Sequence, residues 1–529
     1  MNSEKECFTP VSENNASGRR TPVPGKTTDS RKQIIFAKDD KNDPERNKLY
    51  QRQMDSTDKE LKYDFKGISS ISSGPDADLL KKLEAGEDLY PCCDTSIWLR
   101  SCSEEVVEPL QGEVTGSIPK WLKGTLLRNG PGSLKVGDMT FGHLFDGSAL
   151  LHRFAIRGHH VTYQSRFLHT QTYQRNIAAK RIVVTEFGTK AVPDPCQTIF
   201  QSISALFTPG ESISDNAMIS VYPFGDEFYT FTESPVIHRV DPKTLKTLAR
   251  VNVSKYVSIV NHTSHPHVMQ DGTVYNLGLT VTCTGPHYSI IKFPPAQDAG
   301  CEGVKCSEKT LTTFEQAIIV GSTPARWPFH PSYMHTFGIT ENYFVIVEQP
   351  LSVSVPAMIK SQILNEPMAA NLQWYQDQQT QILLLQRKDG KLFKTFLTEP
   401  FFYLHIINSF EEEDHLIIDI CCYKDPSMLD CMYVDALRLI KVDIKTRTKK
   451  TWCEDNVYPS EPIFVPSPDP KNEDDGVVLS ALIWGRGLEK QVGVLVLDAS
   501  TWQELGRATF TTPSPVPKCL HGWFTGDSC

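Results

Sequence analysis

A strand–turn–strand unit recurs along the chain, and it limits the possible folds more than any other feature. The unit places aspartate after a β-prone run, then a short turn with threonine, then a second run; the copies are HRVDPKTLKTL from 238, IKVDIKTRTKK from 440 and LVLDASTWQEL from 495. LLQRKDGKLFKTF from 384 is a looser copy. Repeated paired strands are typical of propeller blades. A sandwich of hairpins, the alternative, would exceed the usual domain size of up to about 250 residues. The repeat therefore favours an all-β propeller.

Composition divides the chain into two parts. Residues 1–86 are rich in Ser, Asn, Asp, Lys and Pro and poor in apolar residues, so we expect a disordered N-terminal extension. From residue 87 to 529, short apolar runs alternate with Gly, Pro, Asp and Asn turns, for example RIVVTEFGT, YFVIVEQP and HLIIDICCY. We expect this second part to form the propeller domain.

Charge and cysteine usage restrict partners and location. The net charge is −9 and there is no basic stripe, which argues against a nucleic-acid partner. The N-terminus lacks the apolar core of a secretion signal, and no run of 18 apolar residues could span a membrane. The 14 cysteines are scattered, as expected for reduced thiols. These features predict a cytoplasmic protein that is not secreted.

Three histidines lie within six residues in HTSHPHVMQDGTVYNLG, namely His262, His265 and His267. The spacing matches neither a helical His-Glu-x-x-His site nor paired Cys-x-x-Cys ligands, so it is no standard zinc signature. The Asp271–Gly272 pair followed by a β-prone run predicts a hairpin. This local pattern leaves open whether a metal binds.

In a propeller the inner strands converge on one axis, so residues far apart in sequence can share a site. Single histidines occur in four β-like segments: His265 in TSHPHV, His335 in PSYMHTFG, His405 in FFYLHIINSF and His521 in CLHGWF. Each alone is more typical of a satisfied core histidine. Together, four neutral imidazoles would suit iron, copper or zinc.

Carboxylates from outside the ligand set usually orient metal-binding histidines. Glu233 in YTFTESP and Glu461 in YPSEPIFVP lie in otherwise apolar β-like runs and are candidates for this role. The alternative for each is an ordinary glutamate at a sheet edge or in a loop.

Several motifs resemble those of the carotenoid cleavage oxygenase family: LLRNGPG, HLFDGSALLHRF, TEFGT, VPDPC, SHPH, PSYMHTFG, YPSEPIFVPSPDP and HGWF. The resemblance runs from about residue 88 to the C-terminus and is strongest to the insect branch of the family. It implies a seven-bladed propeller with one ferrous ion on the axis, held by His265, His335, His405 and His521. It also implies that Glu233 orients His335 and Glu461 orients His521, and that His262 and His267 are not ligands.

The family resemblance also implies a reaction. Fe²⁺ with O2 as co-substrate would cleave a double bond of a carotenoid of the β-carotene or zeaxanthin type and give retinal. In the insect branch, trans-to-cis isomerisation would give 11-cis-retinal as visual chromophore. Two alternatives stay open: a shortened form that binds carotenoid, retinoid or partner proteins without turnover, and a propeller scaffold for protein interactions.

A carotenoid dissolves in membranes, so transient contact with a membrane surface is expected. Two apolar segments, at 195–210 and 350–364, could form an interfacial patch or be ordinary core helices. Cys196 beside the first segment is a candidate for palmitoylation.

The chain departs from the family in one place. Family members continue with a long segment after CMYVDAL, whereas here Leu437 is followed directly by Arg438 and LIKVDIKT. Roughly a hundred residues are absent, about two blades at 40–50 residues each. The absent part includes the glutamate expected to orient His405. We therefore predict an incomplete propeller, whose activity the sequence alone does not settle.

Overall fold

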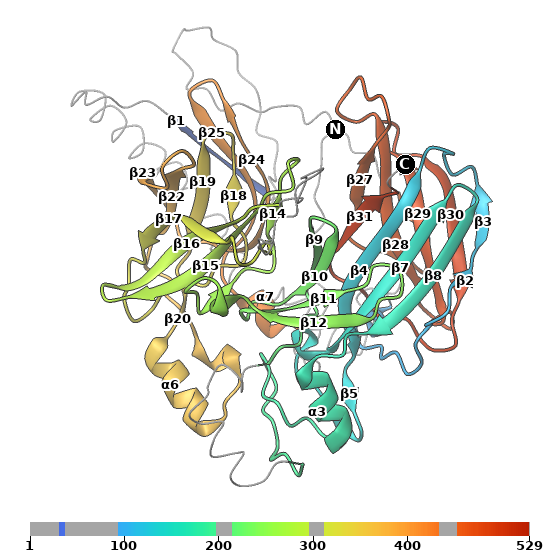
Figure 1. Ribbon diagram of the computed structural model, residues 1–529, viewed down its shortest axis with the longest axis horizontal. Helices are drawn as coiled ribbons and strands as arrows, with labels where there is room; N and C mark the ends of the chain where they lie inside the picture. Colours follow the sequence, from blue (N-terminus) through green and yellow to red (C-terminus); the bar gives the residue numbers. More distant parts are fainter. Residues whose placement is uncertain (1–30, 38–93, 197–213, 296–311, 433–451, 528–529) are drawn as a thin grey trace, which may run out of the picture.

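The computed structural model describes residues 31–37, 94–196, 214–295, 312–432 and 452–527, and within them the fold is mostly β (Figure 1). The described strands form six sheets of three or more strands and two sheets of two strands. The prediction of a β-rich fold is confirmed. The predicted junction at 437–438 and the repeat copy from 440 lie outside the described residues.

Three of the sheets are each built from strands of one stretch in the middle of the chain. The first has the order β12 (Thr247–Asn252), β11 (Val236–Val240), β10 (Glu227–Phe231) and β9 (Ser220–Phe224). The second has the order β13 (Asn261–His262), β15 (Val274–Thr282), β16 (Gly285–Phe293) and β17 (Ile318–Pro324), with β14 (His267–Val268) also pairing with β15. The third has the order β18 (Gly338–Ile339), β19 (Tyr343–Glu348), β22 (Thr380–Gln386) and β23 (Leu392–Thr398).

The other three sheets combine strands from distant parts of the chain. The fourth has the order β1 (Arg31–Ala37), β25 (His415–Tyr423) and β24 (Phe402–Glu412). The fifth has the order β26 (Val457–Pro459), β28 (Gly476–Trp484), β29 (Gln491–Asp498), β30 (Glu504–Thr511) and β3 (Glu113–Gly116), and β27 (Ile463–Pro466) pairs with β28. The sixth has the order β2 (Leu110–Gln111), β8 (His160–Phe167), β7 (Ser148–Arg157), β4 (Lys123–Ser133) and β31 (Gly522–Gly526).

Short elements complete the fold. Two two-stranded sheets are formed by β5 (Lys135–Val136) with β6 (Met139–Thr140) and by β20 (Leu351–Val353) with β21 (Leu372–Trp374). In the described ranges the α-helices are α3 (Gln171–Ala179), α6 (Val355–Leu364) and α7 (Ser427–Asp430), and the 3₁₀ helices are η1 (Thr95–Trp98), η2 (Leu144–Asp146), η3 (Val253–Lys255) and η4 (Met368–Asn371). In Figure 1, α3 and α6 lie on the same side of the sheets.

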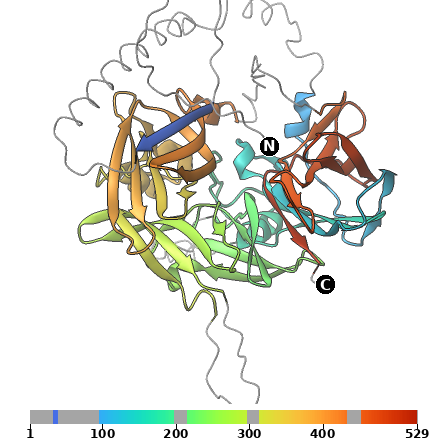
Figure 2. The same ribbon diagram turned by 90° about the horizontal axis from the view of Figure 1, so that it is seen from above.

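Apolar clusters join the six sheets in one series, and Figure 2 shows the sheets placed around a common centre. Five clusters contain side chains from two neighbouring sheets, for example Val494 with Phe154, Leu151 with Val221, Phe224 with Val274, Ile290 with Phe344, and Val345 with Ile418. The series therefore begins with the β26–β30 sheet and ends with the β24–β25 pair. Strands β28 and β29 are buried almost continuously because both of their faces are covered by protein.

The repeated unit forms the same tight turn in each described copy. Asp241 accepts a backbone hydrogen bond from Leu245, and Asp498 accepts one from Trp502; both donors have left-handed backbone, with φ of 59° and 64°. The looser copy has the same pattern, from Gly390 to Gln386, with φ of 69° at the glycine. A Cβ on Gly390 would collide with the Val320 carbonyl, so glycine is required there. The repeat predicted these hairpins correctly.

One strand was not predicted. Residues 31–37, which composition placed in a disordered extension, form β1 and pair with β25 over seven residues, from Arg31 opposite Cys421 to Ala37 opposite His415. Composition describes the average of a long segment and can miss a short β-prone run such as RKQIIFA within it. The remainder of 1–86 lies outside the described residues.

Candidate metal centre

The four predicted ligands all lie at inner sheet edges. His265 lies between β13 and β14, His335 three residues before β18, and His521 immediately before β31. His405 lies within β24, where the register with β25 shifts between Tyr403 and Ile406. Each position is at or next to the edge strand of a different sheet. The fold thus brings the four histidines together, and we call them the histidine cluster.

Their imidazole rings are close enough to share one ion. Ligand nitrogens of His265, His335 and His405 all lie within 4.8 Å of one another, and the Nε2 atoms of His265 and His335 are 3.1 Å apart. The ring centroid of His521 lies 4.6 Å from that of His265 and 5.2 Å from that of His405. The structure therefore contains a three-histidine site, with the fourth imidazole beside it.

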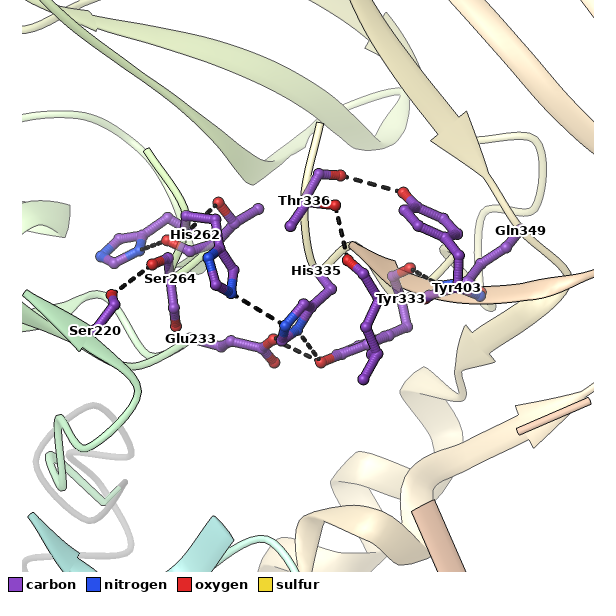
Figure 3. A network of polar contacts seen from close by, with 12 residues as sticks. Ser220, Glu233, His262, Ser264, Tyr333, His335, Thr336, Gln349 and Tyr403 are labelled. Carbon is purple, nitrogen blue, oxygen red and sulfur yellow. Dashed lines mark hydrogen bonds and ion pairs between the residues drawn. The ribbon is translucent and has the colours of Figure 1, made fainter. Parts of the chain in front are cut away.

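Glu233 contacts His335 (Figure 3). The Nδ1 of His335 lies 2.7 Å from Oε1 of Glu233, and the Tyr333 hydroxyl donates to the same oxygen over 2.5 Å. Burial and the nearby Glu233 raise the pKa of Tyr333 well above its usual value, so its hydroxyl remains a donor. With Nδ1–H directed to Glu233, the Nε2 of His335 is free to bind a metal.

Glu461 contacts His521 in a similar way. Oε1 of Glu461 lies 2.8 Å from Nδ1 of His521, and Oε2 accepts a hydrogen bond from Arg128 over 2.7 Å. Burial alone would raise the pKa of Glu461, but the hydrogen bond from His521 and the charge of Arg128 outweigh burial and lower it. Glu233 and Glu461 thus each contact one histidine of the cluster.

His405 differs from His335 and His521. In the described part of the chain no carboxylate contacts it, and its buried Nε2 has no hydrogen-bond partner. Burial, together with His335 and His521, lowers the pKa of His405 to about 2. Burial and its histidine neighbours likewise hold the pKa of His265 well below its usual value.

Neutral imidazoles with a buried, unpartnered ring nitrogen suit a divalent transition-metal ion. A metal ligand must be deprotonated, and the low pKa values of His265 and His405 satisfy this condition at neutral pH. Imidazole donors fit iron, copper or zinc rather than calcium or magnesium, which prefer oxygen ligands. The site residues therefore fit a metal of the kind that the sequence predicted.

The two neighbouring histidines have other partners. His262 is buried, and its Nδ1 lies 2.9 Å from the Thr263 carbonyl. The Nε2 of His267 lies 2.9 Å from the carbonyl of Phe337, to which it can donate. The predicted hairpin is present, with Gly272 in the left-handed region at φ of 79°. Among the three local histidines only His265 belongs to the cluster.

The model of the Retinal pigment epithelial membrane protein family matches residues 99–439 and 436–526. The chain belongs to this family, the carotenoid oxygenases. A carotenoid isomerooxygenase of Galleria mellonella is 52% identical over 513 positions that include 83% of this chain and 98% of the relative. Another, of Drosophila melanogaster, is 41% identical and includes 84% of this chain and 95% of the relative.

Solved structures support the fold of this carotenoid oxygenase. The cobalt-substituted Synechocystis apocarotenoid oxygenase matches with a TM-score of 0.63 and 20% identity, over 82% of this chain and 99% of that chain. At that identity the match concerns the fold alone, which is a seven-bladed propeller. The predicted fold family is therefore confirmed.

Sequence reasoning missed two residues of this oxygenase's site. Arg128 and Tyr333 contact the orienting glutamates, yet neither was singled out. Arg128 lies within LLRNGPG, where a charged side chain interrupts an apolar run; such an interruption in a buried strand signals a specific partner. The partner itself, 333 residues away, could not be read from sequence.

Proposed function

We propose that this protein is an Fe²⁺-dependent oxygenase that cleaves a polyene double bond of a carotenoid and releases retinal. The observation that carries the proposal is the histidine cluster with its two orienting glutamates, in a chain that belongs to the carotenoid oxygenases. Ligands from four different sheets have no evident structural purpose other than to hold an ion.

One iron per chain would be held by His265, His335, His405 and His521, with His521 completing the three-histidine site. A ferrous ion held there would supply the activation of O2 that carotenoid cleavage needs. The protein's own part is to present neutral donors in fixed tautomers. Glu233 and Glu461 do this for His335 and His521 by accepting their Nδ1–H groups.

The names of the insect relatives suggest the substrate class and a further step. We propose a carotenoid of the β-carotene or zeaxanthin type as substrate, and trans-to-cis isomerisation that gives 11-cis-retinal for visual pigment. Support comes from the two isomerooxygenases described above, one of which is 52% identical to this chain.

We further propose that the chain is shortened at Leu437–Arg438 and lacks about two blades, in part or whole. The family model matches in two segments that overlap at 436–439, and the alignment with the Galleria relative runs over 513 positions while using only 83% of 529 residues. The alignment therefore has more positions than aligned residues of this chain, so it must place gaps in this chain. In addition, six sheets are described, and the β24 sheet has only two strands from the propeller domain.

We also propose that the protein is a cytoplasmic enzyme that contacts a membrane surface transiently. Helix α6 exposes Met358, Ile359 and Leu364, and α3 on the same side of the molecule exposes Ile177. The described residues contain no helix long and apolar enough to cross a membrane. Cys196 is exposed and remains a candidate for acylation. Most of the other apolar segment, 195–210, lies outside the described residues.

The experiment that tests the function is retinoid chromatography after incubation of purified protein with ferrous iron, O2 and detergent-solubilised carotenoid. A matched protein with the missing family segment restored between Leu437 and Arg438 serves as comparison. We expect retinal from both proteins. Retinal from neither would contradict the proposal.

A second candidate function is carotenoid or retinoid binding without turnover. It is favoured by His405, for which the described residues supply no orienting carboxylate like those of His335 and His521; loss of such a partner typically costs about 10- to 100-fold in metal affinity or activity. Retinal from the restored protein alone, together with carotenoid uptake by the natural chain, would establish this second function.

A further inference from the structure

Arg128 is a fully buried arginine whose side-chain hydrogen bonds to the described residues go to groups around His521. It lies on β4, with 0% of its surface exposed. Its Nη1 donates to Glu461, its Nη2 donates to the backbone carbonyl of Leu520, and its Nε lies 3.4 Å from the sulfur of Cys519. Three groups adjacent to one proposed ligand thus share a single guanidinium.

The backbone reinforces this arrangement. Asn129, next to Arg128, donates its N–H to the carbonyl of His521 over 2.9 Å and accepts from the N–H of Leu520 over 2.8 Å. Gly522 stands opposite Arg128 in the pairing of β31 with β4, and its N–H donates to Oε2 of Glu461. His521 is therefore fixed on both sides by groups of β4 and Glu461.

Both oxygens of Glu461 are used in this network. Oε1 contacts Nδ1 of His521, while Oε2 accepts from Arg128 and Gly522. Without the guanidinium, Oε2 would keep one weak donor at 3.2 Å, and the carboxylate would be free to rotate away from His521. A planar guanidinium restricts that rotation better than a lysine ammonium, which is a single point charge.

We propose that Arg128 is a positioning residue of the metal centre, which holds Glu461 in the orientation that keeps Nε2 of His521 directed to the ion. The inference rests on the proposed metal binding by the histidine cluster but not on the reaction. Tyr333 supports Glu233 with a neutral hydroxyl, and His405 has no carboxylate partner among the described residues. The Arg128 assembly is therefore the most extensive support in the site.

The test is cobalt binding, followed by the visible absorption of Co²⁺ in metal-free protein. We expect Arg128→Gln to weaken cobalt affinity about 10- to 100-fold and to alter the absorption spectrum, since loss of an outer partner has effects of that size. Arg128→Lys should recover part of the affinity. Arg100→Gln is the matched control, because Arg100 is a buried arginine that pairs with Asp94 and has no contact with the cluster.

A double-variant cycle separates positioning from general stability. If Arg128 acts through Glu461, adding Arg128→Gln to Glu461→Gln should cause little further loss of cobalt affinity. The double variant also removes both charges of the pair, so it keeps the test valid if Arg128→Gln alone fails to fold.

The outcomes are distinct. Wild-type protein that binds no cobalt would contradict the proposed metal site itself. Wild-type cobalt affinity and spectrum in Arg128→Gln would overturn the positioning role, as would full additivity of the Arg128 and Glu461 effects. Loss of affinity in Arg100→Gln equal to that in Arg128→Gln would assign the effect to stability.

Discussion

The three histidines between residues 262 and 267 have different surroundings. His262 contacts a backbone carbonyl, His267 can donate to another, and His265 faces the histidine cluster. Substitution of His265 by glutamine should therefore abolish stoichiometric iron, whereas His262→Gln should keep it, because only His265 has its ring among the other ligands. The number of iron atoms per chain, measured by mass spectrometry of each purified variant, tests this expectation. Equal iron loss in both variants would contradict the assignment.

His152 controls part of the pH dependence of stability. It is buried and lies 2.8 Å from the Tyr163 hydroxyl, and burial together with the charge of Arg128 lowers its pKa from 6.5 to about 3. As pH falls below 6.5 the unfolded chain takes up a proton at His152 but the folded protein does not, so stability is lost between pH 6.5 and 3. At pH 5 this loss is about 2 kcal/mol.

His152→Gln should remove that contribution. Urea unfolding of metal-free protein at pH 7 and pH 5 measures it: the wild type should lose about 2 kcal/mol more than the variant between these pH values. Other buried histidines, such as His262 with a pKa lowered to about 4, remain in both proteins and cancel in the comparison. An equal loss in wild type and variant would show that His152 titrates normally.

At the level of elements, the sequence predicted local features well and partners between distant segments poorly. The turns after Asp241 and Asp498 were predictable because an aspartate and its threonine determine the turn within a few residues. The shift in register that places His405 at the cluster depends on how β24 pairs with β25, which no local pattern records. Strand β1 was missed because its partner is almost 400 residues away.

The pairing of β1 with β25 gives a testable consequence. The two propeller strands β24 and β25 would otherwise leave an edge of unpaired backbone groups, which is a site for association. Deletion of residues 1–37 should increase hydrogen exchange of the peptide 415–423 roughly tenfold, equivalent to about 1.4 kcal/mol of local opening. Deletion of 1–30, which keeps β1, is the control. Unchanged exchange after the longer deletion would contradict the pairing.

Helix α6 was expected either as a core helix or as an interfacial patch. Its N-cap is Ser354, and Ile359 on its surface is 60% exposed, which agrees with the second possibility. Ile359→Glu should reduce co-sedimentation with phosphatidylcholine liposomes several-fold, because an apolar contact would be replaced by a charge. Leu392→Glu, at an exposed position on β23, is the matched control. Equal binding of both variants would exclude α6 as the contact.

On the scale of the whole molecule, the site depends on pairing between strands from the start and the end of the propeller domain. Strand β31 at the C-terminus pairs with β4, and β3 near the start of the domain pairs with β30. Single histidines in four β-like segments were candidates from the sequence alone, but only the family resemblance assigned them as ligands, since positions spread from 265 to 521 carry no local metal motif. Each histidine could be named, but the support from Arg128 required the three-dimensional structure.

Because the four proposed ligands come from four sheets, a bound metal should connect most of the series of sheets. Binding to the folded state alone stabilises a protein by about 2.7 kcal/mol when the metal is at 100 times its dissociation constant. We therefore expect saturating Co²⁺ to raise the melting temperature by several degrees, and a chelator to reverse the change. The His265→Gln variant should show no such increase. Wild-type protein with the same melting temperature with and without metal would show that the histidine cluster binds no ion that links these sheets.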